Sequence, residues 1–210
     1  MSMQIESPGP ARADDDGGKR RQILDGAARV FLDKGFDATS MGEIARAAGV
    51  SKGTLYVYFE DKQALFDAIV DETCQVHAER VFVFDNSDHA VEAVLTRLGI
   101  AFATVMCRAE SMSAIRTVIA IADRMPDMGR RFYETGPARA IAMLAAYLDA
   151  QVAAKVLAIA DTEIAAAQFI DSVLATTFKP VLFNYTTPTP QRIEYVVGIA
   201  VRTFMAAYRV

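Results

Sequence analysis

The chain has 210 residues, of which 52% are hydrophobic and 23% charged, so it can bury a substantial core in one or two domains. Its longest apolar run, residues 140–148, is far shorter than the roughly 18 residues that a membrane span needs, and its start lacks the features of a secretory signal. Two cysteines do not form a disulfide framework, so we expect a cytoplasmic protein that does not enter a membrane.

The net charge of −4 is unevenly distributed along the chain. Residues 1–18 hold one Arg against four Asp or Glu, whereas residues 19–62 hold eight Lys or Arg against six Asp or Glu. The affinity of a protein for DNA depends on where its cations touch phosphate more than on its total charge. The charge distribution is therefore compatible with a DNA-binding N-terminal part, although the bias is mild.

The first segment, residues 1–18, is rich in Ser, Pro, Gly and Asp and has no periodic apolar pattern, which predicts disorder. From Lys19 to Lys34, apolar residues return at helical spacing, and Gly35 then ends the pattern. This segment is predicted to be a supporting helix. The basic residues 19–21 at its start either meet the DNA backbone or form an ordinary solvated helix start.

Two short helical patterns joined by a tight turn follow. Ser40 precedes the first pattern and Glu43 follows three residues on, which is the spacing of a capping box. Gly49 ends this pattern as glycines do in left-handed turns, and Ser51 can cap a second helix that reaches Phe59. Two short helices joined in this way form a helix-turn-helix.

The second helix carries more hydrogen-bonding side chains than a buried helix needs. Leu55 and Phe59 can face the core, so the polar side chains must face elsewhere, and an anionic surface is their natural partner. A helix that enters the major groove with its N-terminal end can bring Lys52 and Thr54 near base edges. Phosphates would then be met by Tyr56, Tyr58, Lys62 and the amides at the helix start near Ser40.

Asp61 can cap the next helix, which we expect to run to about Phe84 and to link the DNA-reading part mechanically to the rest of the chain. Within it, Cys74 and His77 lie three residues apart. No second pair of similar residues is near them, so a packed thiol and an ordinary histidine are favoured over a metal site. No cofactor is expected.

From Asp88 to the C-terminus, helical periodicity never gives way to the alternation of a strand, so the fold class is predicted to be all-α. Helices are predicted over residues 88–106, 110–123, 138–154, 161–178 and 191–208, with Asp88 and Asp161 as caps. Between them, Pro126 opens a turn region, Gly136-Pro137 breaks or kinks the chain, and the proline-rich residues 179–190 form a loop.

The two C-terminal helices have broad apolar faces with small residues that allow close approach. A two-fold dimer would bury these faces in a four-helix interface between subunits, whereas the alternative is burial within one subunit. We favour the dimer, because reading two half-sites of DNA requires two copies. The predicted interface residues are Phe169, Ile170, Val173, Val196, Val197 and Phe204.

Methionine and aromatic residues gather between residues 88 and 160. Flexible Met side chains beside aromatic rings suit an adaptable apolar cavity for a lipophilic ligand, and they suit a solid core equally well. Cys107, next to Arg108, would be an oxidant sensor only if its thiol pKa were lowered. The candidate pocket residues are Phe102, Met106, Met112, Arg116, Ile119, Tyr133, Met143 and Tyr147.

A dense run of recognisable residues lies between Gly35 and Lys62. It comprises Gly35-Phe36, Thr39-Ser40, Glu43-Ile44-Ala45, Ala48 to Tyr56, Tyr58-Phe59 and Lys62. With these residues, the segment of roughly 19–66 resembles the DNA-binding domain of the TetR family of one-component transcriptional regulators. The resemblance implies base or groove contacts by Lys52, Gly53, Thr54 and Tyr56, and phosphate contacts by Ser40, Tyr58 and Lys62. Gly42 stands where many relatives carry Arg or another polar residue, so one base contact from the first helix is expected to be missing.

The same resemblance extends to the rest of the chain. It implies a homodimer and a ligand pocket between the downstream helices, which favours the cavity over the solid core. Residues 116–147 are more weakly similar to AcrR- or AefR-like members, which implies multidrug, efflux or lipid-related control without naming an inducer. We expect the effector to be a small lipophilic molecule. We therefore expect a disordered tail over 1–18, a helix-turn-helix domain over 19–66 and a helical ligand-binding and dimerisation domain over 67–210.

Together, these features predict a dimeric repressor that binds an inverted repeat in double-stranded DNA and is released by its effector. One alternative is an enzyme built on a helical bundle, but the sequence offers neither a nucleophile paired with a base, nor a metal cluster, nor a phosphate loop. Another alternative is a helix-turn-helix that serves protein association alone.

Overall fold

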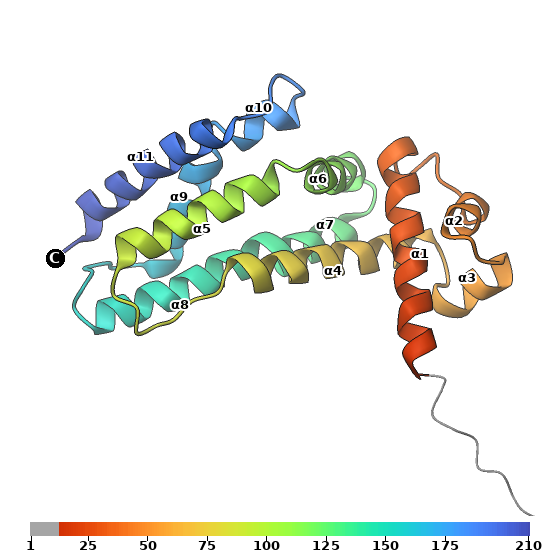
Figure 1. Ribbon diagram of the computed structural model, residues 1–210, viewed down its shortest axis with the longest axis horizontal. Coiled ribbons are helices and arrows are strands. Elements are labelled where there is room, and N and C mark those ends of the chain that lie inside the picture. The colour runs from red at the N-terminus through yellow and green to blue at the C-terminus, as the bar shows by residue number, and fades with distance from the viewer. Residues whose placement is uncertain (1–12) are drawn as a thin grey trace, which may run out of the picture. The chain divides into compact units, whose positions relative to one another are not determined.

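The computed structural model describes residues 13–210, except for the side chains of residues 13–16, 73 and 75–80. The regular structure in this part of the chain is helical, apart from one isolated bridge between Leu157 and Arg209 (Figure 1). The predicted all-α fold class is confirmed. No helix within the described residues is both long enough and apolar enough to span a membrane.

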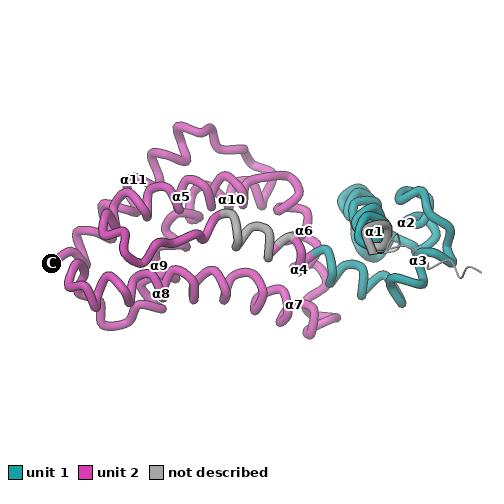
Figure 2. Tube along the Cα trace, turned by 60° about the horizontal axis from the view of Figure 1, so that its bottom comes forward, with its two compact units in different colours: residues 1–69 teal, residues 70–210 magenta. Residues whose placement is uncertain are grey.

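The chain divides into two compact units, residues 1–69 and residues 70–210, which we call unit 1 and unit 2 (Figure 2). The division lies within helix α4 (Lys62–Val81), a few residues beyond the domain boundary expected after residue 66. Asp61 caps α4 as predicted, because its Oδ1 accepts a hydrogen bond from the amide of Ala64 at 2.8 Å.

Unit 1 contains three helices before α4, namely α1 (Ala13–Lys34), α2 (Met41–Ala48) and α3 (Lys52–Tyr58). Gly35 ends α1 with a φ of 76°, as its position predicted. The helix begins at Ala13, so the prediction of disorder is wrong for residues 13–18, and residues 1–12 lie outside the described part. Acidic residues at positions 14–16 explain the early start, since negative charge stabilises a helix N-terminus.

Helices α1 and α2 approach each other closely at Gly26. A Cβ atom on Gly26 would lie 2.6 Å from the Cβ and 2.7 Å from the Cα of Ala48, so no larger residue fits without moving the backbone of α2. The last carbonyls of α2 are bound by α1: Gln22 Nε2 donates to Ala48 O at 2.6 Å and Arg29 Nη2 donates to Ala47 O at 2.9 Å. Helix α2 is therefore anchored on α1 at its C-terminal end.

Unit 2 continues with α5 (Val91–Met106), α6 (Ala109–Ile121), α7 (Pro126–Tyr133), α8 (Arg139–Ala153), α9 (Thr162–Leu174), α10 (Phe178–Leu182) and α11 (Pro190–Tyr208). Asp161 caps α9 as predicted, with its Oδ1 2.9 Å from the amide nitrogen of Ile164. Asp88 does not cap α5, because its Oδ1 accepts from the amide of Ala90, one residue before that helix begins.

Two proline-containing segments of unit 2 differ from the prediction. The break expected at Gly136-Pro137 is instead a π-helical turn, Glu134–Ala138, that leads from α7 into α8. Such turns are rare and occur mostly as single turns within α-helices. The loop expected over residues 179–190 includes the short helix α10. Its proline, Pro180, lies in the first turn, where a missing N–H costs no intrahelical hydrogen bond.

The core of unit 2 is formed by α5, α8, α9 and α11. Gly99 of α5 lies at a close crossing, because a Cβ there would meet Val197 Cγ1 of α11 at 2.8 Å and Val173 Cγ2 of α9 at 3.3 Å. The six residues predicted for the dimer interface are all buried within this one chain, with at most 9% of any of them exposed. This burial corrects the predicted interface: the apolar faces of α9 and α11 pack inside the subunit, so a second subunit can meet only their outward faces.

Candidate nucleic-acid interface

The start of α2 is held by the predicted capping box. Ser40 Oγ accepts from the amide of Glu43 at 3.3 Å, and Glu43 Oε2 accepts from the Ser40 amide at 3.0 Å and from its hydroxyl at 2.8 Å. The other carboxylate oxygen, Oε1, binds Lys34 Nζ at 2.5 Å. The hydrogen bond from Lys34, followed by those from Ser40, lowers the pKa of Glu43 to about 2. The carboxylate therefore stays charged at neutral pH and ties the start of α2 to the end of α1.

Helix α3 is oriented by one cap and two buried side chains. Ser51 Oγ accepts from the amide of Thr54 at 3.0 Å and lies 2.8 Å from the Thr54 hydroxyl. Leu55 and Phe59 are buried in the core of unit 1. Because Leu55 points inward, the opposite side of α3 points outward, and there Gly53, Tyr56 and Val57 are exposed.

The side chain of Lys52 lies across the first turn of α2. A Cβ atom on Gly42 would be 2.9 Å from Lys52 Cε and 3.2 Å from Nζ, and 4.0 Å from Ser40 Oγ. The absence of a side chain at Gly42 thus makes room for Lys52. In this position the ammonium group joins the amides at the start of α2, which lack intrahelical acceptors, and a cation beside such amides suits a phosphate oxygen. Lys52, predicted near base edges, lies beside Ser40, which was predicted at phosphate.

Lys62 is turned towards its own unit. Its Nζ donates to three backbone carbonyls of the α1–α2 connection, Phe36 O at 2.9 Å and Asp37 O and Thr39 O at 3.3 Å each. The same ammonium group lies 4.6 Å from the centre of the Phe36 ring. An ammonium has three N–H donors, and the three carbonyls use them all. This geometry favours a positioning role for Lys62 over the predicted phosphate contact.

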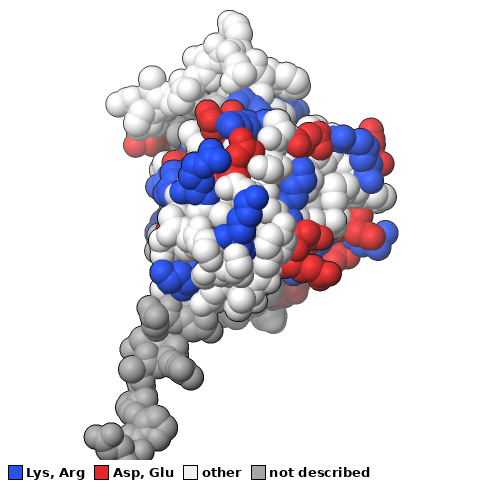
Figure 3. All heavy atoms as spheres, turned by 90° about the vertical axis from the view of Figure 1, so that its right-hand side faces the viewer, with Lys and Arg blue, Asp and Glu red and all other residues white. Residues whose placement is uncertain are grey.

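The structure therefore separates the seven predicted DNA-binding residues into three groups. Ser40 and Lys52 lie together at the start of α2, Gly53 and Tyr56 are exposed on α3, and Thr54, Tyr58 and Lys62 are half-buried. Sequence reasoning missed Val57, which is 82% exposed between the two tyrosines. Its spacing of two residues from the buried Leu55 was the signal that could have found it. In Figure 3, Lys and Arg side chains lie across the middle of this face, and Asp and Glu lie both among them near the top and along its right-hand side.

The predicted ligand-pocket residues are not gathered around one hollow within the described part of unit 2. Ile119 and Tyr133 are 61% and 56% exposed, whereas Met112 is buried. Arg116 binds the end of α10, where its Nη2 donates to Val181 O at 2.6 Å and its Nε to Leu182 O at 3.1 Å. Phe102, Met106 and Met143 are half-buried. The pocket itself stays a prediction.

Tyr147, the last of the predicted pocket residues, is fully buried and serves the core. Its hydroxyl donates to Asp88 O at 2.8 Å, and its ring stacks on Phe84 with centroids 5.1 Å apart. Burial, followed by the nearby Asp88 carboxylate, raises the pKa of Tyr147 to about 12. The hydroxyl therefore remains a hydrogen-bond donor and holds the segment before α5 on α8.

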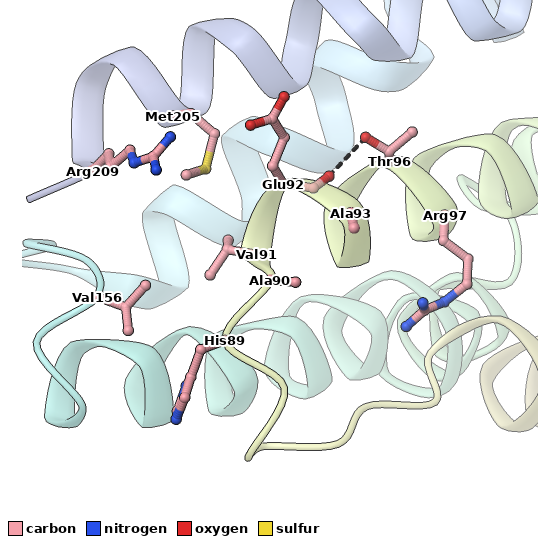
Figure 4. A pocket seen from close by; sticks show the side chains of 10 residues that line it. All are labelled: His89, Ala90, Val91, Glu92, Ala93, Thr96, Arg97, Val156, Met205 and Arg209. Atoms are coloured by element: carbon pink, nitrogen blue, oxygen red, sulfur yellow. Dashed lines mark hydrogen bonds between the residues drawn. The ribbon is translucent and has the colours of Figure 1, made fainter.

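One open hollow of ≈ 700 Å³ lies in unit 2 where α5 begins (Figure 4). Its lining residues are His89, Ala90, Val91, Glu92, Ala93, Thr96, Arg97, Val156, Met205 and Arg209. None of the eight predicted pocket residues lines it. Within the lining of the hollow, Thr96 Oγ1 donates to Glu92 O at 2.7 Å, as a threonine inside a helix commonly does.

Neither cysteine has the properties of a reactive thiol. Burial raises the pKa of Cys107, which disfavours the thiolate that an oxidant sensor needs, and burial also raises the pKa of Cys74. The side chain of His77, considered with Cys74 as a metal site, lies outside the described residues. Among the side chains that the structure does describe, no three His, Cys, Asp or Glu lie close enough to hold a metal ion together.

Comparisons with known proteins agree with this arrangement in both parts of the chain. Residues 93–210 match the family described as AefR-like transcriptional repressor, C-terminal domain. Residues 23–69 match the family described as bacterial regulatory proteins, tetR family. A transcriptional regulator, AcrR from Shigella flexneri, is 52% identical over 50 residues, which are 24% of this chain and 23% of that protein. The matched segment thus spans only about a quarter of this curated relative.

Two solved structures are similar over almost the whole chain. One is described as a putative TetR-family transcriptional regulator from Mesorhizobium loti; it is 29% identical, with a TM-score of 0.83, and the match covers 92% of this chain and 98% of that one. The other, the flavonoid-responsive regulator FrrA, is 30% identical with a TM-score of 0.79 and the same coverage.

Proposed function

Because the chain belongs to the TetR family of bacterial regulatory proteins, we propose that this transcriptional regulator is a dimeric repressor that a small lipophilic effector releases from an inverted repeat in DNA. The observation that carries this proposal is the outward face of α3 together with the adjoining start of α2. This surface brings together the exposed residues Gly53 and Tyr56 of α3, the Lys52 ammonium and the N-terminus of α2.

The contacts divide into two kinds. At the start of α2, Lys52 binds a phosphate and sets the register of unit 1 on the duplex, while Ser40, whose hydroxyl and amide both donate to Glu43, holds this turn in place. The exposed side of α3, with Gly53 and Tyr56, enters the major groove and reads base edges. Thr54 and Tyr58, which are half-buried, contribute at the margins of this face. The bacterial chromosome is cytoplasmic, so the protein acts in that compartment.

The dimer uses the outward faces of α9 and α11. Three large apolar side chains are exposed there, Ile164 on α9 and Tyr195 and Ile199 on α11. Four helices, two from each subunit, would cover these side chains and set the spacing of the two α3 helices to one turn of DNA. Replacing Ile199 by Glu is expected to give a monomer in sedimentation, whereas the same change at exposed Ala154, outside both helices, leaves the dimer intact. A dimeric Ile199→Glu variant would refute this interface.

Release by the effector passes through α4, whose residues belong to both units. Within unit 1, Lys62 ties the start of α4 to the loop that precedes Ser40. Within unit 2, Arg131 of α7 binds Asp71 of α4, with Nε 3.2 Å from Oδ1. An effector that moves α7 would therefore pull on α4. To change DNA occupancy usefully, the binding free energy of the effector must differ by roughly 1–3 kcal/mol between the DNA-bound and the released form of the dimer.

A planar or aliphatic lipophilic molecule is the proposed effector class. The apolar composition of unit 2 supports it, and a relative that matches along almost the whole chain is described as flavonoid-responsive. Titration of a flavonoid panel and a fatty acid panel into the protein–DNA complex tests this point. Release of DNA at micromolar concentrations by members of one panel is expected, and the absence of release by both would contradict the class.

The decisive experiment is selection of bound fragments from genomic DNA at moderate ionic strength. We expect the selected fragments to share an inverted repeat, which the purified chain binds at least about a thousandfold more tightly than bulk DNA. Random recovery would refute the proposal and would favour a helix-turn-helix that serves protein association alone. A catalytic helical bundle finds no support in the named relatives, which are described as transcriptional regulators.

A further inference from the structure

Val57 is an unexpected side chain at the surface of unit 1. It is 82% exposed, the largest exposed fraction among the big apolar side chains described in this unit. It also lies on α3, between Tyr56 and Tyr58. Burying a valine side chain contributes about 1.5–3 kcal/mol relative to leaving it exposed. A surface that a partner covers therefore gains binding free energy from this residue, whereas a surface that stays in water does not.

The position of Val57 on the helix is the centre of the outward face. Successive helical residues are rotated by about 100°, so Val57 lies about 200° from Leu55, which is fully buried. Gly53, one turn earlier, lies about 40° from Val57 on the same ridge. A Cβ on Gly53 would meet only Ser51 Oγ, at 3.8 Å, so the backbone is bare there. Val57 is therefore the exposed side chain on the ridge that begins with the bare backbone of Gly53.

The chemistry of the major groove offers one apolar feature to such a side chain. Base edges present hydrogen-bond donors and acceptors, and thymine alone adds a methyl group at C5. The isopropyl group of Val57 can neither donate nor accept a hydrogen bond, so it gains affinity in the groove only where it meets that methyl group. We propose that Val57 reads a thymine methyl group in each half-site and thereby determines part of the operator sequence. The proposal rests on the DNA-binding function proposed above.

Replacing thymine by uracil tests the proposal directly, because it removes only the methyl group. The operator selected as above is synthesised with uracil at one symmetric pair of thymines at a time, and the affinity of each duplex is measured at fixed salt. Three proteins are compared: the unmodified chain, Val57→Ala, and Val83→Ala. Val83 is the matched control, because it is an equally apolar side chain, 66% exposed, in unit 2.

The unmodified chain and Val83→Ala are expected to lose about three- to fivefold in affinity for each substituted half-site at one thymine position. Val57→Ala should bind the thymine and uracil duplexes of that position equally, and its melting temperature should be unchanged because Val57 packs little. Two outcomes overturn the inference while leaving the proposed function intact: no thymine position responds to uracil, or Val57→Ala responds as strongly as the unmodified chain. Failure of the unmodified chain to select any operator would instead refute the proposed function, and this inference with it.

Discussion

Each unit contains a glycine at which two helices cross closely, but the two crossings differ in what surrounds the glycine. Gly26 of unit 1 faces the backbone of α2, with Ala48 Cα 2.7 Å and Ala48 N 2.8 Å from the position of a Cβ. At Gly99 of unit 2, the three atoms nearest to the position of a Cβ are methyl groups of Val197 and Val173. Backbone atoms cannot turn aside, whereas side chains can change rotamer.

The helices of the two units are therefore held together by different kinds of contact. In unit 1, α2 is fixed through its backbone by the Gly26 crossing at one end, and by the bond between the Lys34 and Glu43 side chains at the other. A DNA-reading surface needs such fixed positions, because misplacement by an ångström costs its contacts. In unit 2, interdigitated side chains hold α5, α9 and α11 together, and such a core can repack around an effector at lower cost.

The largest expected effect is that of Gly26→Ala. The added methyl group would force α1 and α2 apart, and overpacking of this kind costs about 1–3 kcal/mol. We expect a clear loss of thermal stability and of operator binding, both measured on the purified full-length chain. Gly18→Ala on the same helix has nothing within 4 Å of the new methyl group and should be neutral or stabilising. Gly99→Ala should be milder than Gly26→Ala, and the reverse order would show that the crossing in unit 2 is the less tolerant of the two.

Lys62→Met should have the next largest effect. Methionine keeps most of the aliphatic stem but leaves three carbonyls without their donor, at a cost of about 1–2 kcal/mol. Operator affinity should fall because the loop before Ser40 loosens, while the slope of log affinity against log salt stays the same. Lys52→Met, the matched change at the lysine that we propose to contact DNA, should reduce that slope by about one. A reduced slope in Lys62→Met would instead support the phosphate contact that the sequence predicted for this residue.

Glu43→Gln is expected to have a smaller, pH-dependent effect. The folded-state pKa of Glu43 is lowered to about 2, chiefly by the hydrogen bond from Lys34, so its stabilising contribution is fully present above about pH 4.5 and is lost as pH falls towards 2. Thermal unfolding should therefore show Glu43→Gln to be less stable than the unmodified chain at pH 7, with the difference vanishing near pH 2. A constant difference across this range would show that the charge of Glu43 does not contribute.

The smallest expected effect is that of Gly42→Ala, which sharpens the role of Lys52. The new methyl group would displace Lys52 from the start of α2, and the flexible end of that side chain can yield, so stability should hardly change. Operator affinity should fall by about two- to fivefold in the unmodified background and not at all in a Lys52→Ala background. Equal losses in both backgrounds would mean that Gly42 does not act through Lys52.

The ends of several helices and the fold class of this protein are determined by local sequence alone. The capping box of Ser40 and Glu43, the left-handed Gly49, and the caps at Ser51 and Asp161 all follow from residues within four positions of each other, so the sequence was sufficient to predict them. The same holds for the all-α class, because helical periodicity is visible in a single segment.

Tertiary structure alone decided what each face meets. Periodicity indicated that α9 and α11 bury an apolar face, but only the fold shows that α5 and α8 of the same chain cover it. Lys62 binds carbonyls 23 to 26 residues earlier, and Arg116 binds carbonyls 65 and 66 residues later. The physical reason is that a side-chain pattern records how much of a helix is buried and on which side, whereas the identity of the partner depends on how distant segments come together.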